Sequence, residues 1–378
     1  MFKTDCLLLL LYKKYFMSEK PSSVHYINYL ALDKILDAQH LVSKEKGEEA
    51  HEEMLFIIIH QAYELWFKQI LHELNSSFKL FKADKIDESN IGVVVNRMDR
   101  INKIMTTLIV QVDVLETMTP LDFLEFRNHL SPASGFQSHQ FRKLELLLGL
   151  KIEKRHQPGG CPYHAQFEGV KKQEILNLEE GESLFTLVEK WLERIPFLNF
   201  EDFDFIEKYE NAVNEMLEKE IAEIKLADLT EQDKMLRIRM IDENRKYFER
   251  VLNEDQHKES ITKGETKLSY KATMSALLIN LYRDQPILHL PYQFLRSLVE
   301  LDHKISTWRF RHMQMVEKML GQKIGTGGSA GQEYLKQTVD RHKLFTDLAN
   351  ISTLMISRSY LPDLPQNIKE KLGFSYVK

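Results

Sequence analysis

The sequence is poor in several features that define large classes of protein. Only two cysteines, Cys6 and Cys161, occur in 378 residues, too few for a disulfide framework or a thiolate metal site. The net charge of −5 offers no basic field for nucleic acid or for an anionic membrane. No stretch approaches the roughly 20 apolar residues of a membrane helix. These absences predict a cytoplasmic protein that binds neither nucleic acid nor membrane.

The first 22 residues differ from the rest of the chain. An apolar run from Cys6 to Tyr12 is too short to span a bilayer, and lysines follow it where a signal peptide needs small residues for cleavage. Met17 opens a more conventional polar start. We therefore predict a disordered leader over 1–22, with Met17 as the true start, and one folded domain over 23–378.

The sequence also lacks strand signals, since it shows neither an alternating apolar run, nor an Asn-Gly hairpin turn, nor a repeat of fixed period. Apolar residues recur instead at helical spacing. The charged stretch 197–267 has sparse apolar anchors and predicts a pair of solvated helices, inserted as a small subdomain. The fold class is therefore all-α, a helical bundle with predicted helices over 25–46, 51–68, 86–116, 119–130, 137–148, 184–195, 268–283, 292–320 and 333–357.

The helix at 51–68 is apolar almost all round, so we expect it to run through the core. Its main stripe contains Phe56, Ile59, Tyr63, Trp66 and Phe67. His60 lies within this stripe. An imidazole left without a partner in the core costs about 1–3 kcal/mol. His60 is therefore either a core histidine with a protein partner or part of a pocket for a flat ligand.

The helix at 292–320 carries a second histidine among apolar residues. His312 shares a stripe with Ile305, Trp308 and Met315. His303 and Arg309 fall off that stripe, so we expect both to be solvated. A histidine that projects into an apolar cavity of a helical bundle is a common ligand of haem iron, although a core histidine is the simpler alternative.

Two further stretches could bind a ligand. The loop 321–331 holds five of the 15 glycines, and it either ends a helix or brings its backbone close to a ligand. It resembles a dinucleotide fingerprint only formally, because a helix and not a strand precedes it. Phe123 and Arg127 lie four apart on one helix face, where the guanidinium could hold a carboxylate or form a surface ion pair.

A di-iron carboxylate bundle is a weaker alternative, because its Glu-x-x-His pattern occurs here without a suitable apolar stripe. Catalysis by a serine or cysteine nucleophile is weaker still, because no nucleophile-elbow motif occurs. The four Glu-x-x-His matches are Glu48–His51, Glu153–His156, Glu254–His257 and Glu300–His303.

Three segments resemble the tryptophan 2,3-dioxygenase family in sequence and in order. They are FIIIHQAYELWFKQI, LETMTPLDFLEFRNHLSPASGFQS and TWRFRHMQMVEKMLG followed by GTGGSAG. The resemblance extends from about Tyr26 to about Asn350. It implies a haem enzyme, with one ferrous haem b per subunit, that opens the indole ring of L-tryptophan with O2 to give N-formylkynurenine. It also implies a homotetramer in which the N-terminal helix of one subunit closes a neighbour's pocket.

The resemblance implies a role for each matching residue. His312 would be the proximal ligand of the haem iron, and His60 would be the distal, catalytic histidine that interacts with the indole N–H. Arg127 would pair with the substrate carboxylate, and Thr326 would contact the polar end of the substrate. The implied substrate-binding residues are Tyr26, Tyr29, Phe56, Ile57, Ile58, Ile59, His60, Phe123, Arg127, Ser134 and Thr326.

This chain departs from the family pattern at three positions: Ile27 replaces a usual glycine, Arg311 stands where some members have asparagine, and Ala330 replaces a frequent serine. The nearest rival is an indoleamine dioxygenase, but a distal serine is usual there and this chain has His60. A haem-binding sensor and a helical scaffold with two core histidines are the remaining alternatives.

Overall fold

The computed structural model describes residues 24–82, 88–150, 162–200, 203–321, 323 and 331–373. The predicted leader over 1–22 lies outside this part of the chain. The described residues are helical almost throughout, which confirms the all-α class. Their one strand pair is two residues long on each side, with Asn199 opposite Asp204 and Phe200 opposite Phe203 in β1 (Asn199–Phe200) and β2 (Phe203–Asp204).

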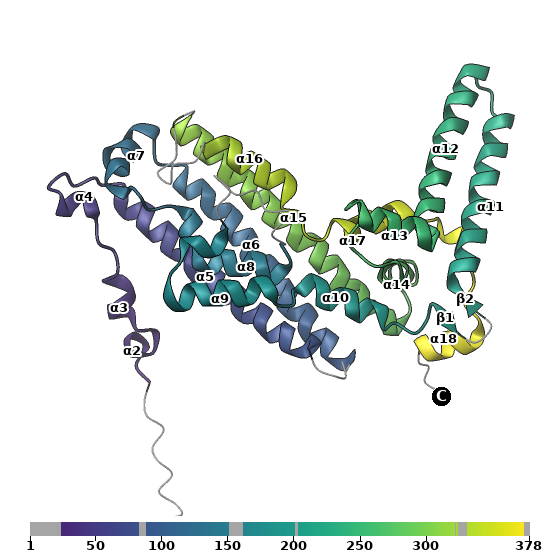
Figure 1. The fold of residues 1–378 in the computed structure, drawn as a ribbon, viewed down its shortest axis with the longest axis horizontal. Helices are drawn as coiled ribbons and strands as arrows, with labels where there is room; N and C mark the ends of the chain where they lie inside the picture. The colour runs from purple at the N-terminus through teal and green to yellow at the C-terminus, as the bar shows by residue number, and fades with distance from the viewer. Residues whose placement is uncertain are drawn as a thin grey trace, which may run out of the picture.

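Three long helices form the centre of the fold. They are α5 (Glu53–Phe81), α6 (Ile91–Leu115) and α15 (Pro286–Leu320). α6 packs against both α5 and α15, and the three run side by side in Figure 1. α8 (His139–Leu148) lies against α5, and α16 (Gly331–Arg341) lies against α15. The helical periodicity of these segments thus predicted the main elements of the bundle.

Smaller helices extend the core at one end of the bundle. α10 (Leu184–Glu193) packs on α14 (Tyr270–Leu281), and both contact the long helices. Trp191 and Phe294 are almost fully buried there, with their ring centroids 5.6 Å apart. The remaining elements are α9 (Gly169–Glu180), α13 (Glu254–Thr262), α17 (Thr346–Asn350), α18 (Gln366–Leu372), η1 (Glu88–Asn90), η6 (Tyr163–Gln166), η7 (Ile351–Leu354) and η8 (Arg358–Tyr360). Of these, α9, α13, α18, η6 and η8 were not predicted.

The charged stretch folds into a helical hairpin. α11 (Phe205–Leu226) and α12 (Glu231–Leu252) pack against each other and project from the end of the bundle (Figure 1). Asp204 caps the first helix and Thr230 caps the second. The predicted pair of helices is therefore present, and its status as a separate subdomain stays a prediction.

A short helix forms one wall of the functional site described below. α7 (Pro120–Arg127) begins at Thr119, whose side chain and that of Asp122 form a reciprocal capping box, with Pro120 in the first turn. η2 (Asn128–Leu130) and η3 (Gly135–Gln137) follow. The N-cap of α8 is Ser138, and Gly149 ends that helix in the left-handed conformation.

The predicted single helix over 25–46 is wrong. The segment forms α2 (Tyr26–Leu30), α3 (Leu32–Leu36) and α4 (Val42–Glu45), and Ala31 adopts a left-handed conformation with φ of 51° between the first two. Side chains of α5 bind the backbone that a continuous helix would need: Gln61 donates to the Ala38 carbonyl, and Glu53 accepts from the N–H groups of Val42 and Ser43. We call residues 24–40 the N-terminal arm; its helices α2 and α3 lie apart from the bundle in Figure 1.

The predicted last helix over 333–357 is also interrupted. α16 ends at Arg341 because side chains of α15 take up the backbone groups that follow it. Asp302 accepts from the N–H groups of Leu344 and Phe345 at 2.8 and 3.1 Å, and Arg309 donates to the His342 carbonyl at 2.9 Å. Long-range hydrogen bonds therefore replace the local ones that would continue the helix.

Two expectations about burial are wrong. The outer face of α5 does not lie in the core of this chain, since Ile58, Leu65 and Trp66 are 47%, 54% and 37% exposed. Arg309 is not solvated but 6% exposed, because it pairs with the buried Glu145 at 2.6 Å. His303 is exposed, as expected.

The described residues include several long helices. None of their helices is by itself long and apolar enough to cross a bilayer. Ile91–Leu115 and Pro120–Leu130 reach the required length and composition only as a pair, with a bend of 91° between them.

Candidate functional site

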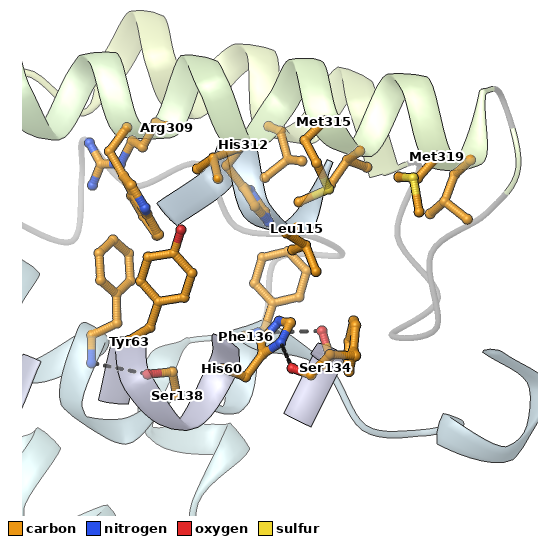
Figure 2. Close-up of a pocket in the computed structure, with 18 of the residues that line it drawn as sticks. His60, Tyr63, Leu115, Ser134, Phe136, Ser138, Arg309, His312, Met315 and Met319 are labelled. Atoms are coloured by element: carbon orange, nitrogen blue, oxygen red, sulfur yellow. Dashed lines mark hydrogen bonds between the residues drawn. The ribbon is translucent and has the colours of Figure 1, made fainter. Parts of the chain in front are cut away.

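A cavity of about 330 Å³ lies between α5 and α15. α6, α7, α8, α16 and the loop after α7 complete its walls. In Figure 2, His312 points from α15 toward His60, which faces it from the α5 side. The lining side chains include Phe56, His60, Tyr63, Glu64, Leu115, Phe123, Arg127, Ser134, Phe136, Ser138, Phe141, Arg142, Trp308, Arg309, His312, Met315, Val316, Met319 and Thr338.

His312 is a neutral imidazole at the wall of this cavity. Its ring stacks on that of Trp308, with centroids 5.8 Å apart and planes 12° apart. Burial, with a smaller contribution from the facing His60, lowers the pKa of His312 to about 4. A neutral imidazole has a nitrogen lone pair, which a metal ion can bind.

His60 offers a hydrogen-bond acceptor from the opposite wall. Its Nδ1 lies 2.7 Å from the carbonyl oxygen of Phe56, one turn earlier on α5. Because a carbonyl can only accept, Nδ1 carries the proton and Nε2 of the neutral ring keeps its lone pair. The ring is open to the cavity, yet the surrounding protein desolvates it, and this burial lowers its pKa. His60 thus suits a ligand that donates an N–H.

Aromatic rings form a slot beside His60. The Phe56 ring lies 4.1 Å from the His60 ring and 5.8 Å from that of Phe123, measured between centroids. Phe126 packs behind them at 5.5 Å from Phe56 and 5.4 Å from Phe123. Arg127 follows one turn after Phe123 and also lines the cavity. The slot therefore combines a place for a flat ring with a cation nearby.

The loop after α7 supplies the polar wall. Ser134 accepts a hydrogen bond from the Phe136 N–H at 3.3 Å, and its own N–H donates to Gln137. Glu64 holds the end of this loop, since it accepts from the Ser138 hydroxyl at 2.5 Å and from the Gln140 amide at 2.8 Å. The carboxylate of α5 thus fixes the loop relative to His60.

The structure places the predicted site residues in three groups. Phe56, His60, Phe123, Arg127, Ser134 and His312 line the cavity together. Tyr26 and Tyr29 lie on the N-terminal arm, 69% and 75% exposed, and do not line the cavity of their own chain. Thr326 lies outside the described residues, as does most of the glycine loop.

The run of three isoleucines after Phe56 does not line the cavity. Ile59 is in the core, whereas Ile58 points outward and is 47% exposed. Successive residues of a helix are about 100° apart, so Phe56 and His60 share the cavity face while Ile57, Ile58 and Ile59 do not.

Several residues that line the cavity or lie directly behind its wall were missed by sequence reasoning. Glu64 lies one turn after His60 on the same face, a spacing that could have revealed it. Arg142 and Glu145 are three apart on α8 and form a buried ion pair at 2.5 Å, but only the fold brings Arg309 to them. Among the residues that the structure describes, no group of three or more histidine, cysteine or acidic side chains could hold a metal ion, so the di-iron alternative finds no support there.

Comparison with known proteins identifies relatives over almost the whole chain. Residues 16–355 match the family model described as tryptophan 2,3-dioxygenase. A tryptophan 2,3-dioxygenase of Bdellovibrio bacteriovorus is 46% identical over 354 residues, which cover 93% of this chain and 99% of that protein. Proteins of the same name from Dictyostelium discoideum and Xenopus laevis are 45% and 44% identical, over 93% and 92% of this chain and 89% and 86% of their own lengths.

The buried imidazole of His312 makes the stability of the ligand-free protein depend on pH. Its folded-state pKa of about 4 lies below the ordinary 6.5, so between these values the unfolded chain binds a proton that the folded chain does not. The contribution of His312 to the free energy of unfolding should therefore be complete above pH 6.5 and fall by about 3 kcal/mol as the pH drops to 4.

Ring ¹⁵N NMR would measure this pKa directly. Urea unfolding of the parent and of His312→Gln across the same pH range would measure its effect on stability. The variant should lose less stability on acidification than the parent does, and identical pH dependence of the two proteins would contradict the prediction.

Proposed function

The chain belongs to the tryptophan 2,3-dioxygenase family, and from this premise we propose that its cavity is the active site. The protein is an oxidoreductase that inserts both atoms of O2 into L-tryptophan to give N-formylkynurenine, the first step of tryptophan degradation through kynurenine. The observation that carries the proposal is the pairing of two neutral histidines across an apolar cavity with an arginine and an aromatic slot beside one of them.

The residues of the cavity fit a haem held by His312. The imidazole is neutral, as an iron ligand must be. Around it the walls are apolar, with Leu115, Met315 and Met319 suited to the faces of a flat macrocycle. Bound there as ferrous haem, the cofactor would activate O2 toward the electron-rich C2–C3 bond of indole.

The protein's own part in the reaction is to bind and orient the substrate. We assign the indole ring to the slot between Phe56 and Phe123. His60 would accept the indole N–H at Nε2, the atom that its hydrogen bond to Phe56 leaves available. Because an indole N–H is a weak acid, His60 acts by positioning the ring more than by removing its proton.

The polar end of tryptophan needs charged and hydrogen-bonding partners. Arg127 would pair with the carboxylate, since a guanidinium can bind both oxygens at once. Ser134 lines the cavity nearby, and the resemblance assigns Thr326 to the same end of the substrate. Desolvation of these polar groups at an otherwise apolar site strengthens each interaction and keeps water from the reacting bond.

The N-terminal arm is assigned to a neighbouring subunit. Tyr26, Tyr29 and Leu36 are largely exposed on it, and the outer face of α5 exposes Leu65 and Trp66. Apolar surfaces of this extent are typical of protein interfaces. We therefore propose a homotetramer in which the arm of one chain closes the pocket of the next. The cytoplasmic location stays a prediction from composition.

The function is tested with haem-supplied protein that is reduced and mixed with L-tryptophan in air. The parent should form N-formylkynurenine, and His312→Ala should lose haem. Arg127→Ala should keep haem but lose roughly 2–5 kcal/mol of transition-state binding, seen as a fall in kcat/KM, because the substrate carboxylate is left unpaired. Arg239→Ala is the control, since it removes a guanidinium that is 79% exposed on α12.

A parent that binds haem and forms no product would favour a sensor or carrier, and a colourless parent would exclude the haem enzyme. These two outcomes differ in the absorption spectrum alone, before any turnover is measured.

Substrate binding should weaken in acid because His60 must be neutral to accept the indole N–H. Its pKa is lowered by burial from 6.5, so the KM for tryptophan should stay constant above pH 6.5 and rise only below it. His60→Ala should have a KM about three- to tenfold higher at pH 7, because one hydrogen bond is lost. The KM of this variant should not rise further in acid, whereas the KM of the parent should. A parent-like acid profile in this variant would assign the titration to another group.

Mixed oligomers would show whether the arm acts on a neighbour. One chain carries Arg127→Ala with an intact arm, and the other carries Tyr26→Ala and Tyr29→Ala with an intact pocket. If the arm acts between subunits, co-expression should yield oligomers more active than either variant alone, because some pockets receive an intact arm. Activity no higher than the average of the two variants would place the arm's effect within one chain.

A further inference from the structure

A buried ionic cluster lies behind the cavity wall. Glu145 of α8 accepts from Arg142 at 2.5 Å and from Arg309 of α15 at 2.6 Å. The Nδ1 of His342 lies 3.6 Å from the same carboxylate. Glu145, Arg142, Arg309 and His342 are only 3%, 6%, 6% and 1% exposed. Both arginines line the cavity, whereas Glu145 does not and lies behind them.

The cluster is ionised in the folded protein. Burial alone would raise the pKa of the Glu145 carboxyl, but Arg142, the neighbouring His342 and Arg309 together hold that pKa well below its usual range. Removing one partner of such a cluster leaves a buried charge uncompensated, which costs far more than the net contribution of the pair. Glu145 therefore determines where two guanidinium groups can lie.

The cluster joins three elements at the turn of α15 that carries His312. Arg309 precedes His312 by three residues, less than one helical turn, and both side chains line the cavity. In Figure 2 both extend from α15, with Arg309 directed along the helix and His312 directed toward His60. Arg309 also donates to the His342 carbonyl, directly after α16. The ring of Trp308, next to Arg309 in the sequence, stacks on the ring of His312. It also contacts the ring of Phe141 on α8, and the centroids of the Trp308 and Phe141 rings are 5.1 Å apart.

We propose that Glu145 is a positioning residue for the iron ligand: through Arg309 it sets the distance between α8 and the His312 turn of α15. The inference rests on the proposed function, because it assigns to His312 the ligation of haem iron. Glu145 touches neither haem nor substrate in this assignment. Its contribution is to hold the imidazole and the segment after α16 in one fixed arrangement.

The chain contains a matched control for this role. Glu73 on α5 is also buried, 4% exposed, and accepts from Arg100 at 2.7 Å and from Gln69 at 2.8 Å. It lies 13 residues after His60, about 20 Å farther along the helix, and does not line the cavity. Glu73→Gln therefore removes a buried, paired carboxylate without touching the His312 turn.

The first test is a spectroscopic haem titration of parent, Glu145→Gln and Glu73→Gln, each with its thermal unfolding recorded. Groups that orient a metal ligand typically change metal affinity about 10- to 100-fold when they are removed. Glu145→Gln should weaken haem binding by that factor and shift the absorption bands that report axial ligation. Glu73→Gln should lower the unfolding temperature while haem affinity stays within about twofold of the parent.

Haem affinity and bands in Glu145→Gln that match the parent would overturn the proposal. Equal loss of haem affinity in both variants would overturn it too, because the effect would then follow from stability alone. If Glu145→Gln does not fold, Glu145→Asp replaces it, since it keeps the charge and shortens the side chain by one methylene. Weakened haem binding with shifted bands in folded Glu145→Asp supports the proposal, and parent-like binding refutes it.

Hydrogen–deuterium exchange of the haem-free proteins gives a second readout. Glu145→Gln should raise exchange around 305–315 and 342–345, whereas Glu73→Gln should raise it only near α5 and α6. Unchanged exchange at 305–315 in Glu145→Gln would contradict the positioning role. A parent that fails to bind haem would instead refute the proposed function, so the two failures are distinguishable.

Discussion

The functional site depends on one physical constraint, which is the removal of water from around His60 and His312. Both His60 and His312 are surrounded closely enough that burial lowers their pKa, and each therefore presents a lone pair at neutral pH. An imidazolium at either position would face a second imidazole across a largely apolar space. The long helices α5 and α15 keep the two rings opposed, because each is anchored along its length in the core.

Most of the fold was predictable because helical periodicity is a local property. The stripes on α5, α6 and α15 mark the faces that these helices bury. The predictions were wrong where long-range hydrogen bonds replace local ones. Gln61 and Glu53 bind the backbone of 38–43, and Asp302 and Arg309 bind that of 342–345. No pattern within either segment records partners that lie outside it, from 10 to 43 residues away along the chain.

The site was predictable to the extent that its residues share one helix face. His60 follows Phe56, and Arg127 follows Phe123, at the four-residue spacing that brings side chains together, and all four line the cavity. The resemblance also assigned Ile57 to Ile59 to substrate binding, yet these residues point away from this cavity. Arg309 is a residue whose burial the sequence does not predict. Its position off the apolar stripe predicts solvent, and only the fold supplies the carboxylate that allows its burial.

Glu64 and Glu145 explain how polar side chains can surround an otherwise apolar cavity. Glu64 binds Ser138 and Gln140, and Glu145 binds the guanidinium groups of Arg142 and Arg309. Each carboxylate supplies a partner for polar side chains that line the cavity, Ser138 in one case and Arg142 and Arg309 in the other. α8 receives both contacts, one at its start and one near its end, and α5 and α15 supply the opposite partners. α8 is thereby tied by hydrogen bonds and ion pairs to both of the helices that carry the two histidines.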